Sequence, residues 1–387
     1  MGDQNISKIE KLLEKGVKIP NPRSVDIGDD VDIDRISAQG VVIYSGCRIY
    51  GNSTLILQGA KLGYEAPVTV ENCQIGPEAA LRGGFFREAV FLKEASMGSG
   101  AHVREGTILE EKANGAHTVG LKQTILFPFV TLGSLINFCD CLMSGGTGRN
   151  DHSEVGSSYI HFNYTPNQDK ATPSLIGNVP GGVMLNQRPI FLGGQGGLVG
   201  PCRLTFGNII AAGTINRKNE LRPDRLIFEG GKTGNIAFTP GPYYNLRGIV
   251  KNNLIYIGNL LALMQWYSHV RSQFISDMFP EALLDGLREK LNMGTEERIR
   301  RLKALFLKQE TGLSAKWPET EGLIRSQQEY PGDIGLRDEF LEKTGEEIKK
   351  SGNDYISVIR KLKANDAETG TRWLQGIVDS FEKRCCL

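Results

Sequence analysis

Two histidines that alternate with apolar residues are among the side chains of this sequence that could do acid–base chemistry. His102 and His161 each stand between two apolar neighbours. Because successive side chains of a strand point to opposite faces, both imidazoles are expected to point outward. An imidazole is able to act as a general base, although a lone outward histidine is more often a solvated surface residue.

Two other features offer weaker chemistry. The glycine-rich segment SGGTGRND, residues 144–151, lacks the strand-to-helix turn that a phosphate-binding loop needs. Cys139 and Cys141 are not spaced as zinc ligands, and no second Cys/His pair complements them, so no metal site is predicted. The odd number of cysteines, seven, favours reduced thiols and a cytoplasmic location.

The charge balance excludes several classes of partner. Lys and Arg together number 45 and Asp and Glu 44, which gives no electrostatic reason to expect binding to nucleic acid or to an acidic membrane surface. The first residues include acids where a signal peptide needs a basic segment. The longest apolar run, near residues 254–264, is too short to span a bilayer.

A repeat of about six residues must position these side chains. In each unit a small or β-branched residue stands two places before an aliphatic one, and glycine often follows. The pairs include Val25/Ile27, Cys47/Ile49, Ser53/Leu55, Ala60/Leu62, Val68/Val70, Cys73/Ile75, Ala101/Val103, Thr107/Leu109, Val130/Leu132 and Cys202/Leu204. Each pair fits a short strand with both members pointing inward, and glycine suits the tight corner that follows.

Three such strands and corners close a triangular coil of about 18 residues, and stacked coils bury one another's apolar faces. The repeat therefore predicts a left-handed parallel β-helix of about ten coils, in a domain that we place at residues 25–245. An antiparallel sandwich is the alternative, but its turns recur at roughly 8–12 residues rather than six.

Helices are predicted on both sides of the repeat. Residues 1–24 contain an amphipathic helix, Ile6–Gly16, that is expected to cap the open end of the β-helix. All three tryptophans follow residue 250, while most of the 47 glycines precede it, so residues 246–387 are predicted to form an α-helical domain. The expected helices are Leu254–Gln273, one beginning at an N-cap Thr295, and three amphipathic ones at 333–350, 354–363 and 367–383. This domain carries no catalytic motif, and capping or oligomerisation is its expected role.

Three segments carry a resemblance to a known family. VREGTILE begins at Val103, SSYIHFNY at Ser157 and LGGQGGLVGPCRLTFGNIIAAGTINRK at Leu192. With them, residues 8–218 resemble the acetyltransferase half of the bacterial bifunctional N-acetylglucosamine-1-phosphate uridyltransferase/glucosamine-1-phosphate acetyltransferases, and so proteins related to UDP-N-acetylglucosamine pyrophosphorylase. The glycine-rich nucleotide loop of the uridyltransferase half has no counterpart at this N-terminus.

The resemblance implies acyl transfer from acetyl-CoA or another acyl-CoA to an amino sugar phosphate or nucleotide sugar, in a homotrimer whose coenzyme groove lies between subunits. Such transfer needs a general base for the amine, donors for the oxyanion and cations for the phosphate. The substrate-binding residues of the family fall on Arg104, Lys122, Asn163 and Tyr164. The residues that line the coenzyme groove fall on Ser157, Gly194 and Ala212.

The sequence departs from the family at the base itself. The family's catalytic histidine falls on Ser134, and a substrate tyrosine falls on Asn137. Residues 144–151 and the stretch around Pro180–Pro189 are insertions, and His152 takes the place of a substrate asparagine. Two interpretations follow.

In the first interpretation the site is rebuilt, with His152 or, as a weaker choice, His161 as the base and Arg149 as a new phosphate contact. In the second, catalysis is lost, and the protein is a non-catalytic scaffold that binds a sugar phosphate or nucleotide sugar.

Overall fold

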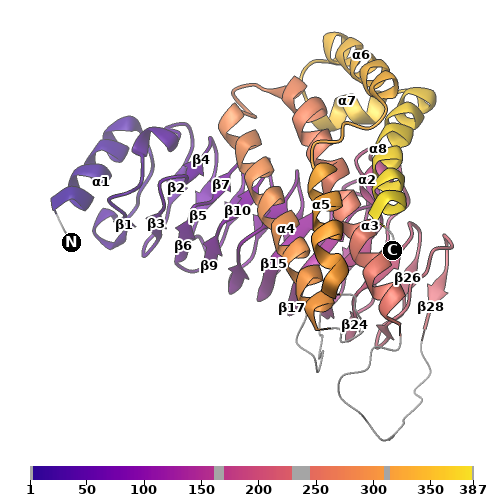
Figure 1. Ribbon diagram of the computed structural model, residues 1–387. Helices are drawn as coiled ribbons and strands as arrows, with labels where there is room; N and C mark the ends of the chain where they lie inside the picture. Colours follow the sequence, from indigo (N-terminus) through magenta and orange to yellow (C-terminus); the bar gives the residue numbers. More distant parts are fainter. Residues whose placement is uncertain (1–2, 161–169, 229–244, 309–313, 386–387) are drawn as a thin grey trace, which may run out of the picture.

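The computed structural model describes residues 3–160, 170–228, 245–308 and 314–385, and it is a parallel β-helix with helices along one side (Figure 1). The strands wind through about eleven turns, so the predicted left-handed β-helix with a C-terminal helical region is confirmed. The predicted boundary between the two parts adjoins residues 229–244, which lie outside the described residues. The proposed domain limits therefore stay a prediction.

Three faces form the prism. The first face contains β1 (Asp26–Ile27), β3 (Arg48–Tyr50), β6 (Val68–Glu71), β9 (Gly84–Arg87), β12 (Ala101–Val103), β21 (Ser158–Ile160), β24 (Gly196–Leu198) and β27 (Ile215–Asn216). The second contains β4 (Leu55–Ile56), β7 (Gln74–Ile75), β10 (Ala89–Phe91), β13 (Thr107–Leu109), β22 (Ser174–Ile176) and β25 (Cys202–Leu204). Two longer strands, β15 (Val119–Leu126) and β17 (Ile136–Met143), bend from the first face into the second.

The third face forms a separate sheet. Its strands are β2 (Val42–Ile43), β5 (Lys61–Leu62), β8 (Ala80–Leu81), β11 (Ser96–Met97), β14 (Asn114–Gly115), β16 (Thr131–Leu132), β20 (Glu154–Val155), β23 (Phe191–Leu192), β26 (Ile209–Ile210) and β28 (Leu226–Ile227). We call the corner between the first and second faces the first edge, that between the second and third faces the second edge, and that between the third and first faces the third edge.

Side chains alternate along each strand as the repeat predicts, with one register error. Val68 and Val70 are buried and Thr69 between them is not. The pair Ser53/Leu55, however, is wrong by one residue. Leu55 pairs with Gln74, whose side chain faces the helices, so Leu55 points outward. The prediction failed there because both sides of this strand are buried, which removes the alternation on which it relied.

The corners use left-handed backbone at other residues about as often as at glycine. Along the first edge φ is +51° at Asn72, +50° at Glu88, +49° at Gln123 and +56° at Asp140. This conformation costs a residue with a Cβ roughly 1–2 kcal/mol. Hydrogen bonds between coils offset the cost, for example from the Gln123 N–H to the carbonyl of the preceding coil at 3.0 Å. Glycine is therefore an incomplete marker of these corners.

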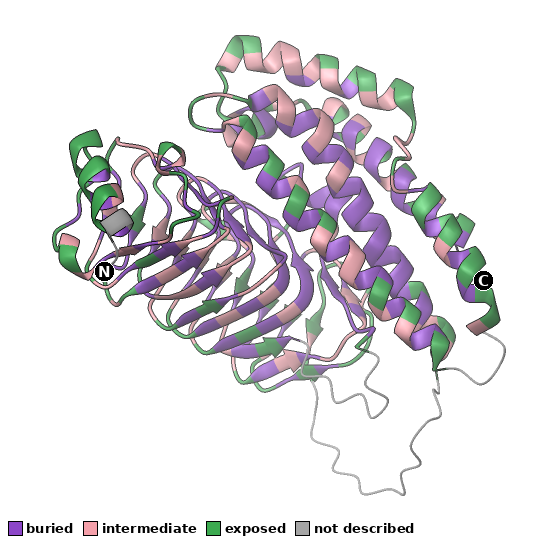
Figure 2. Cartoon of the chain, turned by 60° about the vertical axis from the view of Figure 1, so that its left-hand side comes forward, coloured by how far each residue is buried: buried purple, intermediate pink, exposed green. Residues whose placement is uncertain are grey.

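The second face is apolar on both sides, and helices cover it. Its outward column contains Val90, Ile108, Ile125 and Leu142 in register, and all four are buried. Figure 2 shows buried residues both inside the β-helix and on the helices that lie along it. A sheet with no polar face must be covered on both sides, so the helical region is part of the same hydrophobic core.

Six α-helices follow the β-helix in the described part of the chain. They are α3 (Leu246–Gln265), which continues into a π-turn (Trp266–Val270) and a 3₁₀ turn (Arg271–Phe274), then α4 (Glu281–Leu307), α5 (Trp317–Ser326), α6 (Ile334–Ser351), α7 (Tyr355–Lys361) and α8 (Ala364–Cys385). Helices α6 and α7 are capped by Asp333 and Asp354, since each carboxylate accepts a backbone N–H of the first turn. Thr295 is not a cap. It lies inside α4, where its hydroxyl donates to the Leu291 carbonyl at 3.0 Å, because the helix already begins at Glu281.

Helix α4 follows the stacked coils along the first edge. Its contacts recur at every fourth residue: Gly286 with Gln74, Lys290 with Glu88, Gly294 with Gln123, and Arg298 with Asp140. The rise from Gly286 to Arg298 is ~18 Å, close to the ~19 Å that four strand spacings require. One helical turn therefore meets about one coil, and each buried cation of α4 meets an acid at a corner of the β-helix.

The second insertion anchors the helices. It includes α2 (Val179–Gly182), whose first N–H donates to Asn259 Oδ1 of α3 at 2.9 Å. Thr371 of α8 donates to the Pro180 carbonyl at 3.3 Å. The inserted residues therefore connect the β-helix to α3 and α8.

At the other end, α1 (Asp3–Lys15) caps the first coil as predicted. Its Ile9 and Leu12 are buried, and Lys8 Nζ donates to three carbonyls of the first coil, those of Gly28, Asp29 and Val31, each at 2.8 Å. The helix thereby covers the open end of the β-helix and provides a donor for carbonyls of its first corner.

Replacing Arg298 by Ala should destabilise the protein by about 3–5 kcal/mol, because it leaves the buried Asp140 carboxylate without its cation. The side chains of this pair are 2% and 9% exposed, with Nη2 and Oδ1 at 2.6 Å. Arg300, two residues further along α4 and 68% exposed, is the matched control, and R300A should cost less than about 1 kcal/mol. Urea unfolding of both variants provides the measurement, and equal losses would contradict this assignment.

A second prediction concerns Glu110, which lies under the helices and accepts a hydrogen bond from Tyr267 at 2.6 Å. Burial raises the pKa of Glu110 to about 7. A raised carboxyl pKa stabilises the fold at low pH, so the free energy of unfolding should fall by about 3 kcal/mol as pH rises from about 4.5 through 7. In Glu110→Gln this contribution should vanish, as measured by urea unfolding across that pH range.

Tyr267→Phe is the control for Glu110→Gln. It removes the hydrogen bond but leaves the carboxyl buried, so the pH dependence should persist. A wild-type stability that does not decline relative to E110Q between pH 4.5 and 7 would contradict the burial argument.

Candidate functional site

The outer surface of the first face carries a ladder of polar and small residues over the central coils. His102, Gly120 and Asn137 pair in register on β12, β15 and β17. His102 is exposed, as predicted, and stacks on Phe85 with ring centroids 5.2 Å apart. A Cβ on Gly120 would lie 3.3 Å from Asn137 Oδ1, so the Asn137 amide lies close to the glycine.

Two of the predicted substrate-binding residues, Arg104 and Lys122, lie on neighbouring coils where this face meets the first edge. Arg104 follows β12, and Lys122 lies one coil further in β15. Lys122 Nζ lies 2.8 Å from Glu105 Oε1. Burial alone would raise the pKa of Glu105, but its hydrogen bond with Lys122 prevails and lowers it to about 2. Glu105 is thus a fixed anion that orients Lys122.

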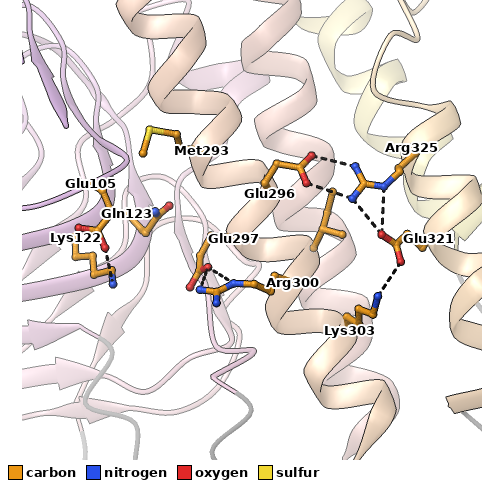
Figure 3. Close-up of a pocket in the computed structure, with 11 residues that line it drawn as sticks. Glu105, Lys122, Gln123, Met293, Glu296, Glu297, Arg300, Lys303, Glu321 and Arg325 are labelled. Carbon is orange, nitrogen blue, oxygen red and sulfur yellow. Dashed lines mark hydrogen bonds and ion pairs between the residues drawn. The ribbon is translucent and has the colours of Figure 1, made fainter. Parts of the chain in front are cut away.

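A pocket of about 540 Å³ opens beside Lys122, between the first edge and α4 and α5 (Figure 3). Acidic and basic side chains pair along its walls. Glu296 accepts two hydrogen bonds from Arg325 at 3.2 Å, and Lys303 Nζ lies 3.6 Å from Glu321 Oε2. A volume of this size suits a small molecule. The helical region therefore supplies a second wall to the edge that carries Lys122, a contribution that the repeat alone did not predict.

At the third edge an imidazole lies beside Ser134, the residue that stands where the family has its catalytic histidine. His117 Nδ1 lies 2.7 Å from Ser134 Oγ, one coil away. Ser134 is the residue on which the family's histidine falls, so the ring reaches that place from the neighbouring coil. Sequence reasoning missed His117 because it lies at a corner, next to left-handed Thr118, and not in an alternating strand. The only available signal was its separation from Ser134 by 17 residues, one coil.

The predicted coenzyme-groove residues stack on the same edge. Ser157, Gly194 and Ala212 occupy corresponding positions of three successive coils after β20, β23 and β26. Their coils approach so closely that a Cβ on Gly156 would lie 2.6 Å from the Gly194 nitrogen, and one on Gly193 would lie 2.4 Å from that of Ala212. The edge is therefore narrow and smooth in the coils beyond Ser134.

A second cavity, of about 340 Å³, opens beside His117 over the preceding coils. Its lining includes Arg82 and Glu65, whose side chains form an ion pair at 3.3 Å. Cavities thus flank the first face on both sides, one at the edge with His117 and one at the edge with Lys122.

Arg149 and His152 lie elsewhere, at the second edge, which is opposite the first face. They belong to the hairpin of β18 (Gly146–Gly148) and β19 (Asp151–His152). Arg149 Nη1 donates to the Lys112 carbonyl at 3.1 Å and to the Phe129 carbonyl at 3.2 Å, so it binds the corner of the β-helix. Within one chain, the structure does not bring His152 and Arg149 together with Arg104 and Lys122.

The remaining predicted residues, His161, Asn163 and Tyr164, lie outside the described residues. Among the residues that are described, no group of three or more His, Cys, Asp or Glu side chains is arranged to hold a metal ion. In the same part of the chain, no helix combines the length and the apolar character needed to cross a bilayer.

Comparison with known proteins identifies one recurrent relative. The chain is 28% identical over 209 residues to the bifunctional protein GlmU of Thermotoga maritima, a match that covers 54% of this chain and 41% of that protein. The GlmU of Corynebacterium aurimucosum is 25% identical over 232 residues, covering 60% and 42% of the two chains. That of Pelobacter propionicus is 28% identical over 238 residues, covering 61% and 44%. No family model matches the chain.

The chain thus spans less than half the length of these relatives. The extent of the matches and the β-helix fit the acetyltransferase half of such proteins, and the resemblance that the sequence motifs predicted is confirmed.

Proposed function

From this similarity to the acetyltransferase half of GlmU proteins, we propose that the protein transfers an acyl group from acetyl-CoA, or another acyl-CoA, to the amine of an amino sugar phosphate or nucleotide sugar. The observation that carries the proposal is the contact between His117 and Ser134 at 2.7 Å. It supports a general base at the place where the sequence has serine for the family's histidine.

In the proposed reaction the amine nitrogen attacks the thioester carbonyl, an amide C–N bond forms and the C–S bond breaks. In the tautomer whose Nδ1–H donates a hydrogen bond to Ser134 Oγ, Nε2 of His117 carries a lone pair. That lone pair is available to take the amine proton. The proton then passes to the departing coenzyme thiolate. Backbone N–H groups would stabilise the oxyanion.

The binding roles follow the edges of the first face. Arg104 and Lys122 at the first edge would bind the sugar phosphate, since both side chains are partly exposed there. Ser157, Gly194 and Ala212 at the third edge would line the coenzyme groove, on the side of the prism where His117 lies. Asn163 and Tyr164 remain proposed substrate contacts, and His161 and His152 remain alternative bases.

One observation favours the alternative, a non-catalytic protein that binds a sugar phosphate or nucleotide sugar. Asn137 and Ser134 replace the tyrosine and histidine of the family, so substrate contacts as well as the base are changed. The two functions differ in coenzyme binding and turnover, which the next experiment measures.

We expect thiol release from acetyl-CoA by the full chain with glucosamine 1-phosphate or a related amino sugar phosphate. His117→Ala should lower kcat/KM by about 10²–10⁴-fold, the usual contribution of a general base. His152→Ala should leave it close to wild type, because that histidine lies at the opposite edge. The thiol is measured continuously with a disulfide reagent.

The reverse pattern, a large loss in His152→Ala and none in His117→Ala, would transfer the role of base to His152. If calorimetry detects no binding of coenzyme A while an amino sugar phosphate still binds, the scaffold function is correct and the enzyme proposal fails.

A homotrimer is the proposed assembly, and exposed apolar side chains support it. Phe191 and Ile209 pair in register on the outside of the third face, where they are 41% and 45% exposed, and Leu226 follows at 62%. A contiguous apolar stripe of this kind is typical of a protein interface.

Phe191→Glu combined with Ile209→Glu should therefore convert the trimer to monomers, as measured by light scattering after size-exclusion chromatography. Ile6→Glu, 45% exposed on α1, is the control and should leave the assembly unchanged. A wild-type chain that is monomeric at micromolar concentration would refute the proposed assembly.

A further inference from the structure

A half-exposed tyrosine stands on the first face, close to the groups that the proposed reaction uses. Tyr159 is the middle residue of β21, between the buried Ser158 and Ile160, so its side chain points outward. The residue is 50% exposed. A ring that is this exposed adds little to the core of the β-helix and is able to contact a ligand on the surface of the face.

The strand register places Tyr159 beside Asn137. The two residues are partners across β17 and β21, and on its other side Tyr159 is the partner of Gly197 in β24. Neighbouring strands lie about 4.8 Å apart. Tyr159 therefore stands one coil from Asn137, the residue on which the substrate tyrosine of the family falls. A tyrosine side chain is long enough to reach across one such spacing.

The column that contains Tyr159 lies between the proposed base and a proposed phosphate-binding cation. Gly120, Asn137 and Tyr159 are outward partners on three successive coils. On the coil of Gly120, His117 lies three residues before the glycine and Lys122 two residues after it. At about 3.3 Å per residue of extended chain, the column is at most ~10 Å from the His117 backbone and ~7 Å from that of Lys122. The sugar ring of an acceptor that contacts both side chains must lie over this column.

The space beside Asn137 is open to the tyrosine ring. The Asn137 amide leans toward Gly120, since its Oδ1 would lie 3.3 Å from a Cβ on that glycine, and Gly120 is on the side away from Tyr159. A pyranose presents a face of C–H groups and a rim of hydroxyls. A tyrosine matches both, because its ring is apolar and its tip is a hydrogen-bonding hydroxyl.

We infer that Tyr159 binds the acceptor, with its ring against the sugar and its phenol in a hydrogen bond to a sugar hydroxyl. The inference rests on the proposed function, but only on the binding of an amino sugar phosphate or nucleotide sugar and not on catalysis. Both groups that the sequence lacks are then supplied from a neighbouring coil. His117 belongs to the coil before Ser134, and Tyr159 belongs to the coil after Asn137.

Calorimetry with the full chain tests this inference, with glucosamine 1-phosphate and UDP-glucosamine as the probes. Tyr159→Ala should weaken binding about tenfold, and Tyr159→Phe, which keeps the ring and loses one hydrogen bond, about threefold. Tyr64→Ala is the matched control and should bind as the wild type does. Tyr64 is 70% exposed and lies three coils before His117 along the third edge.

A double variant moves the tyrosine back by one coil. Asn137→Tyr combined with Tyr159→Ala should restore the affinity to within about threefold of the wild type, a rescue that a merely structural role of Tyr159 does not allow. His117→Ala should bind the probes with unchanged affinity, because it removes the proposed base and not a sugar contact.

The outcomes separate this inference from the proposed function. If the wild type binds a probe and Tyr159→Ala binds it equally well, the inference is overturned while the proposed function stands. A loss in Tyr159→Ala that the double variant does not recover would also overturn it, since the tyrosine would then be needed for structure. If the wild type binds neither probe, the inference and the proposed function both fail.

Discussion

The architecture depends on one constraint: the second face of the β-helix is apolar both inside and outside. Leu142 and Ile125 point outward from strands whose inward side chains are equally apolar. Exposed to water, such a column would be a large apolar surface prone to aggregation. The helices cover this apolar surface. As a result the second face of the β-helix is buried, while the first and third faces stay open.

The covering helices are fixed in register by buried charges rather than by apolar contact alone. Apolar packing is not directional and would allow α4 to slide along the prism. The pairs of Lys290 with Glu88 and of Arg298 with Asp140 permit one alignment only. These acids occupy strained corners of the first edge, so the corner conformation and the helix position are coupled.

The same constraint divides the functions of the three edges. The second edge carries the hairpin insertion and the start of α7, and its polar groups bind the helices or the neighbouring coils. Arg149 illustrates this, since its guanidinium binds carbonyls of the β-helix. The first face, free of helices, keeps an open polar surface between His117 and Lys122, with a cavity at each side.

The sequence by itself determined the β-helix, the capping helix and the resemblance to an acetyltransferase, because a period of about six residues and alternating burial are local properties. Through that resemblance it also identified Arg104 and Lys122 as candidate substrate-binding residues. Only the tertiary structure decided which coil supplies an imidazole at Ser134, and which edge carries His152. The physical reason is that stacking brings together residues that are about one coil apart in the sequence. The number of residues in a coil changes with each insertion, so the sequence period does not give the partner of a corner residue. The helix positions likewise followed from buried pairs between distant segments, which no local pattern contains.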